Sequence, residues 1–132
     1  MIMKGSYVLL IKLEKDKEIQ IGKLGIIAFK KGYYAYVGSA LNGLEQRINR
    51  HLRKNKKMHW HIDYLLKFGK IDSVFYKEHN KKEECNIAKL FSKLISVEGF
   101  GSSDCNCKSH LFYGSKNEII KIIDSQKLKQ FS

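Results

Sequence analysis

Two stretches of the sequence decide the fold: Gly5–Leu13 reads GSYVLLIKL, and Tyr33–His51 reads YYAYVGSALNGLEQRINRH. In the first stretch, apolar side chains alternate onto both faces of an extended chain, which predicts a central strand covered on two sides. In the second, Tyr33–Val37 has the composition of another strand. Apolar residues then recur every four positions and predict a helix over Leu44–Lys54. Its expected buried residues are Leu44, Ile48 and Leu52.

Shorter elements surround these two stretches. Further strands are expected at Ile19–Gly22, Gly25–Lys30, Asp72–Tyr76 and Leu111–Tyr113. Helices are expected at His59–Phe68 and Lys82–Ile95 and, after a capping box made by Ser115 and Glu118, near the end of the chain. The pattern as a whole predicts one α/β (α+β) domain over residues 1–132, with a small, mostly antiparallel central sheet flanked by helices.

The composition limits the classes of protein that fit. The chain has 132 residues, of which 43% are hydrophobic, so one domain can bury one core. It has no signal-peptide pattern and no apolar run of about 18 residues, so we expect a cytoplasmic protein without membrane association. Three cysteines do not make a disulfide framework. Nothing in the sequence indicates an obligate protein partner.

The charge balance indicates a polyanionic partner. Lys and Arg number 25 against 13 acids, which gives a formal net charge of +12. Such a field attracts nucleic acid, which is the expected partner, with DNA favoured over RNA. A Lys-rich surface that serves solubility is the alternative.

The cations cluster on the helix expected after Gly43. Arg47, Arg50 and Lys54 share one helix face, His51 is expected to join that face, and no acid interrupts the chain from Arg47 to His61. A face of this kind can follow a phosphate backbone, and the fork of an arginine fits a single phosphate. A solvated helix surface is the simpler alternative.

Several motifs, taken in order, resemble the GIY-YIG nuclease family. Gly5-Ser6-Tyr7, Tyr36-Val37-Gly38 and an R-x-x-R-H run from Arg47 carry the resemblance, and YVGSA is similar to the homing-endonuclease branch. Most of the chain resembles a narrower group, the Uri-type GIY-YIG-like domains of archaea and bacteria. The matching stretches are GSYVLLI, YYAYVGSALNGLEQRINRHLR, HWHIDYLL, the EC-x-x-A run at Glu84 and GFGSSDCNCKSHLFYG. The sequence departs from the family at Ser6, where Ile is usual, and has one extra residue before Arg47.

The resemblance implies an endonuclease that hydrolyses phosphodiester bonds with a single Mg²⁺ or Mn²⁺ ion. It implies that Arg47 stabilises the transition state and that Tyr7 and Tyr36 surround the attacking water, with Tyr7 as general base and Tyr36 as its partner, or the reverse. His51 would hold a phosphate or relay a proton. The residues expected to bind substrate are Gly38, Ser39, Arg50, Arg53, Lys54 and Lys57.

Glu84 is the expected metal ligand. The acids are few and scattered, but Mg²⁺ needs only one or two protein carboxylates when substrate phosphate supplies other ligands. On its helix Glu84 lies nearer the inward edge than Glu83, and the family pattern of Glu before Cys85 and Ala88 agrees. From the residues alone, two exposed glutamates at a helix start are the simpler interpretation.

Two further segments invite a metal or stacking role. The C-x-C-x-x-H run is weak evidence for zinc, which is not expected here, and a turn with buried thiols is the alternative. That run consists of Cys105, Cys107 and His110. Trp60 could stack on a base, but beside Ile62 it also fits the core, and His59 and His61 could be ligands or buried partners. Two rival functions therefore stay open, a nucleic-acid-binding module without turnover and a zinc-stabilised interaction domain.

Overall fold

The computed structural model describes residues 4–40, 43–53, 58, 60–78, 84–100 and 109–131, and only the backbone of Glu84 and Cys85. The described strands are β1 (Gly5–Leu13), β2 (Lys17–Gln20), β3 (Ile26–Phe29), β4 (Gly32–Ala40), β5 (Lys70–Glu78), β6 (Ile95–Ser96), β7 (Leu111–Gly114) and β8 (Lys129–Gln130). The described helices are α1 (Leu44–Leu52), α2 (His61–Leu66), α3 (Glu84–Leu90) and α4 (Lys116–Ser125), with a 3-10 turn, η1, at Gly22–Leu24.

The central sheet has six strands in the order β6-β7-β4-β1-β5-β8, and each adjacent pair is antiparallel. β1 lies in the middle, hydrogen-bonded to β4 on one side and β5 on the other, which confirms the central strand expected from GSYVLLIKL. β2 and β3 form a separate two-stranded hairpin. The α/β (α+β) class with a mostly antiparallel sheet is therefore confirmed.

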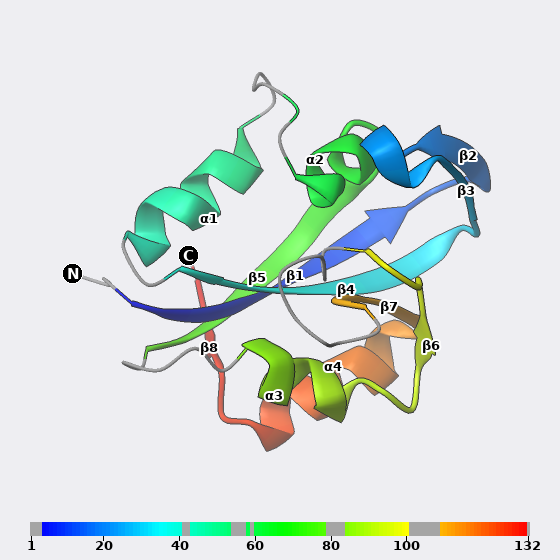
Figure 1. Cartoon of the computed structure of the whole chain (residues 1–132). Helices are drawn as coiled ribbons and strands as arrows, with labels where there is room; N and C mark the ends of the chain where they lie inside the picture. Colours follow the sequence, from blue (N-terminus) through cyan, green and yellow to red (C-terminus); the bar gives the residue numbers. More distant parts are fainter. Residues whose placement is uncertain are drawn as a thin grey trace.

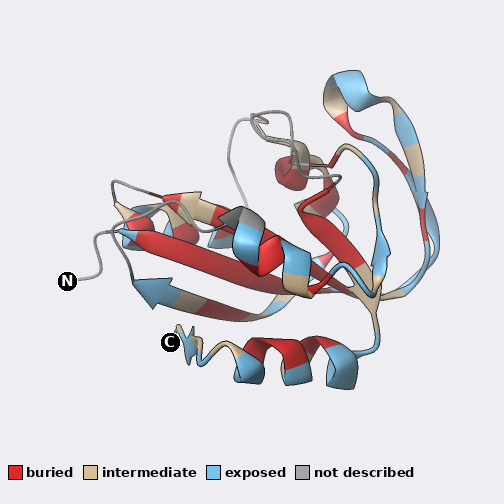
Figure 2. Ribbon diagram, turned by 60° about the horizontal axis from the view of Figure 1, so that its bottom comes forward, coloured by how far each residue is buried: buried red, intermediate tan, exposed pale blue. Residues whose placement is uncertain are grey.

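Helices cover both faces of this sheet (Figure 1). α1 and α2 pack on the face that carries Tyr7, Leu9 and Ile11. α3 and α4 pack on the opposite face, which carries Val8 and Leu10. The alternation along β1 thus sends its odd and even residues into two different cores, and the burial colouring shows this central strand buried along most of its length (Figure 2).

Local signals set the helix ends. Ser115 and Glu118 form the expected capping box, in which the Ser115 hydroxyl accepts from the Glu118 amide at 3.1 Å and the Glu118 carboxylate accepts from the Ser115 amide at 3.0 Å. These bonds also hold the pKa of Glu118 below its usual value. α1 follows Gly43, whose φ of 71° lies in the left-handed region that favours glycine.

Two expectations about helices are wrong. Leu52 is 45% exposed rather than buried, because the inward positions of α1 follow the 3.6-residue period through Leu44, Ile48 and His51. The helix expected over Lys82–Ile95 is described over Glu84–Leu90 only, and Ile95 pairs with Tyr113 in the sheet instead. Among the described helices none has the length and apolar character needed to cross a membrane.

Candidate active site

Tyr7 enters the candidate site from the middle of the sheet. It stands directly opposite Gly38 on β4, and its ring lies across the Gly38 backbone so closely that a Cβ at Gly38 would overlap it. Gly38 was expected to let a substrate approach the backbone. In the structure it makes room for the Tyr7 ring, and this fixes the direction in which the phenol points.

The Tyr7 hydroxyl and His51 Nε2 lie 2.7 Å apart, within hydrogen-bond distance. His51 comes from the last turn of α1 and faces the sheet, so its expected place on the basic helix face is wrong. The Tyr36 ring lies 6.2 Å from the His51 ring, centroid to centroid, and points to the same side of the sheet as Tyr7. The structure therefore brings Tyr7, Tyr36 and His51 together, from two strands and a helix.

Arg47 lies one turn before His51 on the same helix. Its guanidinium donates to the backbone oxygen of Ser39 at 3.1 Å and lies 4.6 Å from the centroid of the Trp60 ring. This contact is a cation–π interaction, which holds a guanidinium in place without neutralising its charge. Arg47 is half-buried and shares the Trp60 ring with His51, whose own ring lies 5.7 Å from that of Trp60.

Arg50 has a different environment. Both of its terminal nitrogens donate to the carboxylate of Asp63, at 2.9 and 3.0 Å, and it also lies over the Trp60 ring at 4.3 Å. Asp63 is fully buried and accepts in addition from the backbone amide of Trp60. The Arg50 guanidinium is therefore engaged by protein groups, and it ties the start of α2 to α1 rather than standing open to a phosphate.

Asp63 is the residue whose importance sequence reasoning missed. The available signal was its position in the first turn of α2, three residues after Trp60, where a carboxylate can accept from the exposed amides of a helix start. Trp60 is the N-cap of that helix and is partly buried, so it joins the site as a platform for the two arginines.

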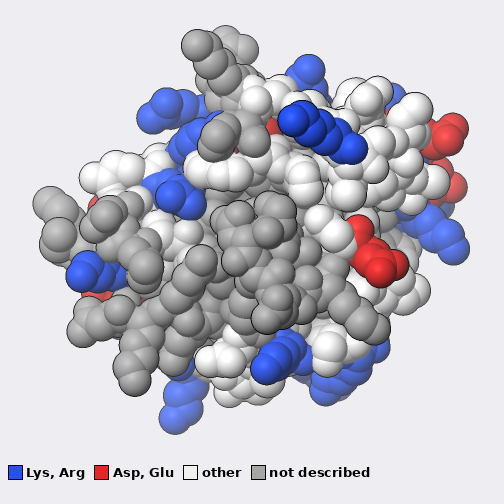
Figure 3. All heavy atoms as spheres, in the orientation of Figure 1, with Lys and Arg blue, Asp and Glu red and all other residues white. Residues whose placement is uncertain are grey.

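Burial separates the inner part of this site from the outer part. Tyr7 and His51 are each 2% exposed and Tyr36 is 7% exposed, whereas Arg47 and Trp60 are partly open and Arg53 is exposed. Lys and Arg side chains lie over α1 and also along other edges of this face, whereas most of the acidic side chains in this view lie toward the end near β2 and β3 (Figure 3). A polyanion would thus meet the cations first, with the phenols and the imidazole behind them.

Not every tyrosine of the YYAY segment belongs to this site. Tyr34 shares the sheet face of Tyr36, but its hydroxyl donates to the backbone oxygen of Lys30 at 2.6 Å. Burial raises the pKa of Tyr34 above its ordinary value, so it stays protonated. His61 lies near the site with its ring 5.6 Å from that of Phe100, and burial lowers its pKa.

Glu84, the expected metal ligand, is the first described residue of α3. Further along this helix, Ile87 and Ala88 pack on the sheet face opposite to Tyr7. The Glu84 side chain lies outside the described atoms, so its metal role stays a prediction. Within the described residues, no group of three His, Cys, Asp or Glu side chains could hold a metal ion.

Other expected site residues lie outside the described part of the chain. Lys54, Lys57 and His59 are among them, as are Cys105 and Cys107 of the weak zinc pattern. His110, the third residue of that pattern, is described and buried, and its backbone pairs with Val37 and Phe100.

Comparisons with known proteins give one match. A family model described as "Domain of unknown function DUF123" matches residues 6–131, which is nearly the whole chain. The comparison with curated proteins and the comparison with solved structures each find no match.

Proposed function

We propose that this chain, which belongs to the DUF123 family, binds nucleic acid through α1 and hydrolyses its phosphodiester bonds at the Tyr7–His51 pair. The hydrogen bond of 2.7 Å between these two side chains is the observation that carries the proposal, and Arg47 lies on the same helix as His51. The motifs that resemble the GIY-YIG nucleases support it independently, since they named Tyr7, Arg47 and His51 as a set. DNA is the preferred substrate of the proposal.

Binding begins with charge. The net charge of +12 attracts a phosphate backbone to Arg47 and Arg53, and the partly open Arg47 receives one phosphate. Binding of this kind weakens as salt rises, by roughly 0.9 log units per log unit of salt for each duplex phosphate that is neutralised.

The Tyr7–His51 pair can then move a proton. With its own proton on Nδ1, His51 accepts the Tyr7 proton through Nε2, and the Tyr7 oxygen takes a proton from the attacking water. The water oxygen bonds to phosphorus while the bond to the leaving oxygen breaks, and that oxygen is protonated from solvent. His51 then releases the proton that it took up to solvent, which restores the starting state. Arg47 offsets the negative charge that develops on the phosphoryl oxygens.

In this proposal, Glu84 is the residue that would hold a divalent ion. Mg²⁺ or Mn²⁺, when bound, neutralises phosphoryl charge and lowers the pKa of a bound water. Glu84 lies at the start of α3. Because α3 packs on the sheet face opposite to Tyr7, this role requires the Glu84 carboxylate to reach the phosphate at Tyr7 past the end of the sheet.

Burial of the inner residues favours a second candidate function. Tyr7 and His51 are each only 2% exposed, so hydrolysis requires that the cover over them opens when substrate binds. If it does not open, the same pair only supports α1, and the chain is a nucleic-acid-binding module without turnover.

One experiment separates these functions. Labelled single-stranded, duplex and branched DNA and RNA are incubated with the protein in Mg²⁺, in Mn²⁺ or with chelator. Tyr7→Phe keeps the ring over Gly38 and removes the hydroxyl, so cleavage should fall roughly 10²–10⁴-fold while binding is retained. Glu84→Gln should abolish metal-dependent cleavage, with Glu83→Gln as the matched control.

Each result decides between the candidates. Cleavage by Tyr7→Phe at the wild-type rate removes Tyr7 from the chemistry. Salt-sensitive binding without cleavage by the wild type supports the binding module, and absence of binding to all these nucleic acids overturns both functions.

A further inference from the structure

Aromatic rings pack around the His51 imidazole. Its ring centroid lies 5.3 Å from that of Tyr7, 6.2 Å from that of Tyr36 and 5.7 Å from that of Trp60. Tyr7 and Tyr36 are buried, whereas Trp60 is partly open to solvent. Of these rings, Trp60 is therefore the one that lies between the Tyr7–His51 pair and the solvent.

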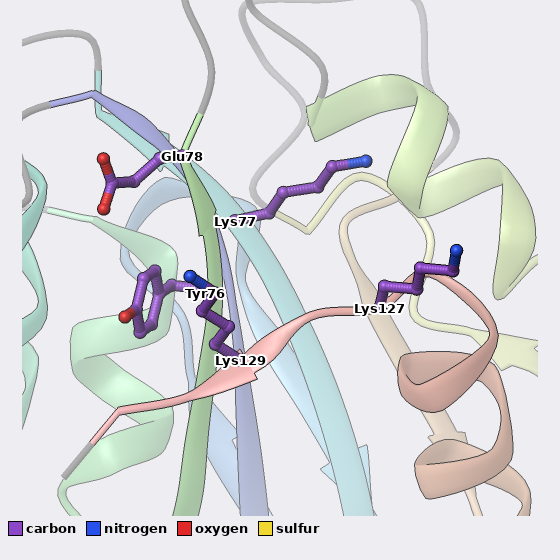
Figure 4. Close-up of a pocket in the computed structure, with 5 residues that line it drawn as sticks. All are labelled: Tyr76, Lys77, Glu78, Lys127 and Lys129. Carbon is purple, nitrogen blue, oxygen red and sulfur yellow. The ribbon is translucent and has the colours of Figure 1, made fainter.

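Tyr76 fills the flank of Tyr7 on β5. The two tyrosines stand directly opposite each other, so they share one face of the sheet, and the Tyr76 ring lies 6.2 Å from that of Phe131. Figure 4 shows the Tyr76 ring on the same side of β5 as Glu78, with Lys77 on the other side. Tyr7 is not among the residues that line the cavity at this edge of the sheet. Tyr76 therefore closes the approach to Tyr7 from β5.

The flank on β4 is filled as well. The Tyr36 ring lies 6.2 Å from that of Phe100, which is fully buried, and the His61 ring lies 5.6 Å from the same phenyl ring. Among the described side chains, Trp60 is therefore the one that stands between an incoming substrate and the buried pair.

The backbone of Trp60 is fixed, and so is one of the two cations on its ring. The Trp60 amide donates to the Asp63 carboxylate at 2.9 Å. The same fully buried carboxylate accepts two bonds from Arg50, which lies 4.3 Å from the centroid of the Trp60 ring. A movement of Trp60 is therefore a rotation of its side chain, while its backbone and Arg50 stay in place.

Arg47 is the second cation, and it connects the Trp60 ring to the sheet. Its guanidinium lies 4.6 Å from the ring centroid and donates to the Ser39 backbone oxygen, near the end of β4, at 3.1 Å. Both partners are neutral, and in the part of the chain that the structure describes no acid pairs with Arg47. A phosphate therefore competes for Arg47 more readily than for Arg50, which already has a carboxylate as its partner.

A substrate phosphate offers Arg47 stronger bonds than its two neutral partners do. Hydrogen bonds between charged groups are roughly twice as strong as neutral ones, and a guanidinium fork binds two phosphate oxygens at once. A ligand shifts an equilibrium when it binds one of the two states better. Arg47 released from Trp60 and Ser39 presents its whole fork, so a phosphate favours the released state.

We infer that the Trp60 ring covers the Tyr7–His51 pair, and that a substrate phosphate opens this cover by drawing Arg47 off the ring. This inference rests on the proposed function, and it names the trigger for the opening that hydrolysis requires. The buried pair then meets water when a phosphate is bound beside it.

The test uses the fluorescence of Trp60, which is the one tryptophan of the chain. The full chain is saturated with labelled duplex DNA in the presence of chelator, and binding is followed by the anisotropy of the label. The emission of Trp60 should shift to longer wavelength, and acrylamide should quench it more strongly, because the ring enters water. Unchanged emission, or a ring that bound DNA shields further, overturns the opening.

Arg47→Gln imitates the opening without DNA. It removes the guanidinium from the ring, so the free variant should already show the shifted emission. Its His51 imidazole should react with diethyl pyrocarbonate about tenfold faster than that of the wild type, because a cation–π contact no longer holds the ring closed. Arg53→Gln, at an exposed arginine that follows the same helix, is the matched control and should match the wild type in both measurements. Wild-type protection of His51 in Arg47→Gln shows that Arg47 does not hold the cover, which overturns the inference.

Two variants of Trp60 separate a cover from a core residue. Trp60→Leu removes the ring, so His51 should react faster than in the wild type at temperatures well below unfolding. Trp60→Phe keeps a ring for Arg47 and should retain most of the protection. If Trp60 serves the core alone, Trp60→Leu lowers the melting temperature and leaves His51 as protected as before, which overturns the cover. Where Trp60→Leu does not fold, the wild-type and Arg47→Gln measurements decide.

Failure of this inference and failure of the proposed function give different results. If the wild type cleaves DNA while the emission of Trp60 stays unchanged on binding, the cover is wrong and the hydrolase stands. If Trp60 and His51 respond as expected and the wild type does not cleave, the cover stands on a binding module.

Discussion

The two layers that cover the central sheet are built from different side chains. The layer toward α3 and α4 has a core of aliphatic residues and phenylalanine. The layer toward α1 and α2 also buries Tyr7, Tyr36, His51 and Asp63. Among the described residues of β1, the α3 side buries only the small hydroxyl of Ser6, so covering this sheet does not require buried phenols, an imidazole or a carboxylate. The buried polar groups on the α1 side therefore indicate a role beyond folding, as perturbed and polar clusters often do.

The two layers also differ in the interactions that stabilise them. On the α3 side, stability depends on filling volume, since packing and burial of apolar area supply it. On the α1 side it depends on keeping partners together, because a buried polar group that loses its partner costs about 1–3 kcal/mol. Substitutions on the two sides should therefore change stability and function in different proportions.

The largest effect is expected at Asp63. Asp63→Ala removes the acceptor of two Arg50 N–H groups and of the Trp60 amide. Breaking a buried pair of this kind costs about 3–5 kcal/mol, and the 22% exposure of Arg50 places the loss toward the lower end. Urea denaturation measures the loss, and nucleic-acid binding should fall as well, because Trp60 and Arg47 lose their support.

Asp72→Asn is the matched control for this change. It removes an ion pair of similar length, 3.1 Å from Lys116, but both partners are partly open to solvent. Such surface pairs contribute little to stability, because solvent screens the two charges. Equal destabilisation by the two substitutions would contradict the claim that stability on the α1 side depends on keeping buried polar partners together.

The second effect is expected at Gly38. In Gly38→Ala the new methyl group meets the Tyr7 ring, which has to move away from His51. Overpacking of this kind costs about 1–3 kcal/mol, and cleavage should fall well beyond the loss of folded protein. The readouts are thermal unfolding and the cleavage rate per folded molecule.

Ile119→Val on the opposite layer separates stability from function. Ile119 is fully buried against the α3 face of the sheet, and the truncation costs about 0.5–1.5 kcal/mol. Its cleavage rate per folded molecule should equal that of the wild type. A parallel loss of cleavage in Ile119→Val and Gly38→Ala would show that activity follows stability alone.

Period and composition predicted the long elements, since these carry a strong repeating signal. GSYVLLIKL specified the central strand, and the capping box of Ser115 and Glu118 specified the start of α4. β6 and β8 were not predicted, because a strand of two residues carries no repeating pattern and forms only where it can pair with the edge of a neighbouring strand. Leu52 was predicted to be buried and His51 to be exposed, and the structure shows the reverse. A spacing of four residues differs from the helix period of 3.6, and the difference is large enough after two turns to change which residue faces inward.

The sequence predicted which residues form the candidate site better than it predicted which of them contact one another. The order of motifs named Tyr7, Tyr36, Arg47, His51 and Glu84. The structure brings Tyr7, Tyr36 and His51 together and places Arg47 and His51 against the same Trp60 ring, whereas α3, which begins at Glu84, packs on the opposite sheet face. The pairing of Arg50 with Asp63 was not predictable, because nothing in either segment specifies which of several cations meets the carboxylate. Only the packing of α2 against α1 decides that contact.

The smallest effect is a pH dependence at His61. Burial lowers the pKa of His61 from its usual 6.5, so the folded protein resists a proton that the unfolded chain accepts. The free energy of unfolding should therefore be fully present above pH 6.5 and fall as the pH drops toward the lower folded pKa. His61→Gln removes this titration, so the difference in melting temperature between variant and wild type should stay constant above pH 6.5. Between pH 6.5 and about 5 the melting temperature of the variant should rise relative to that of the wild type. Glu118 does not titrate in this pH range, because its pKa is held below 4.5. A difference that does not change with pH would show that His61 takes up its proton equally in both states.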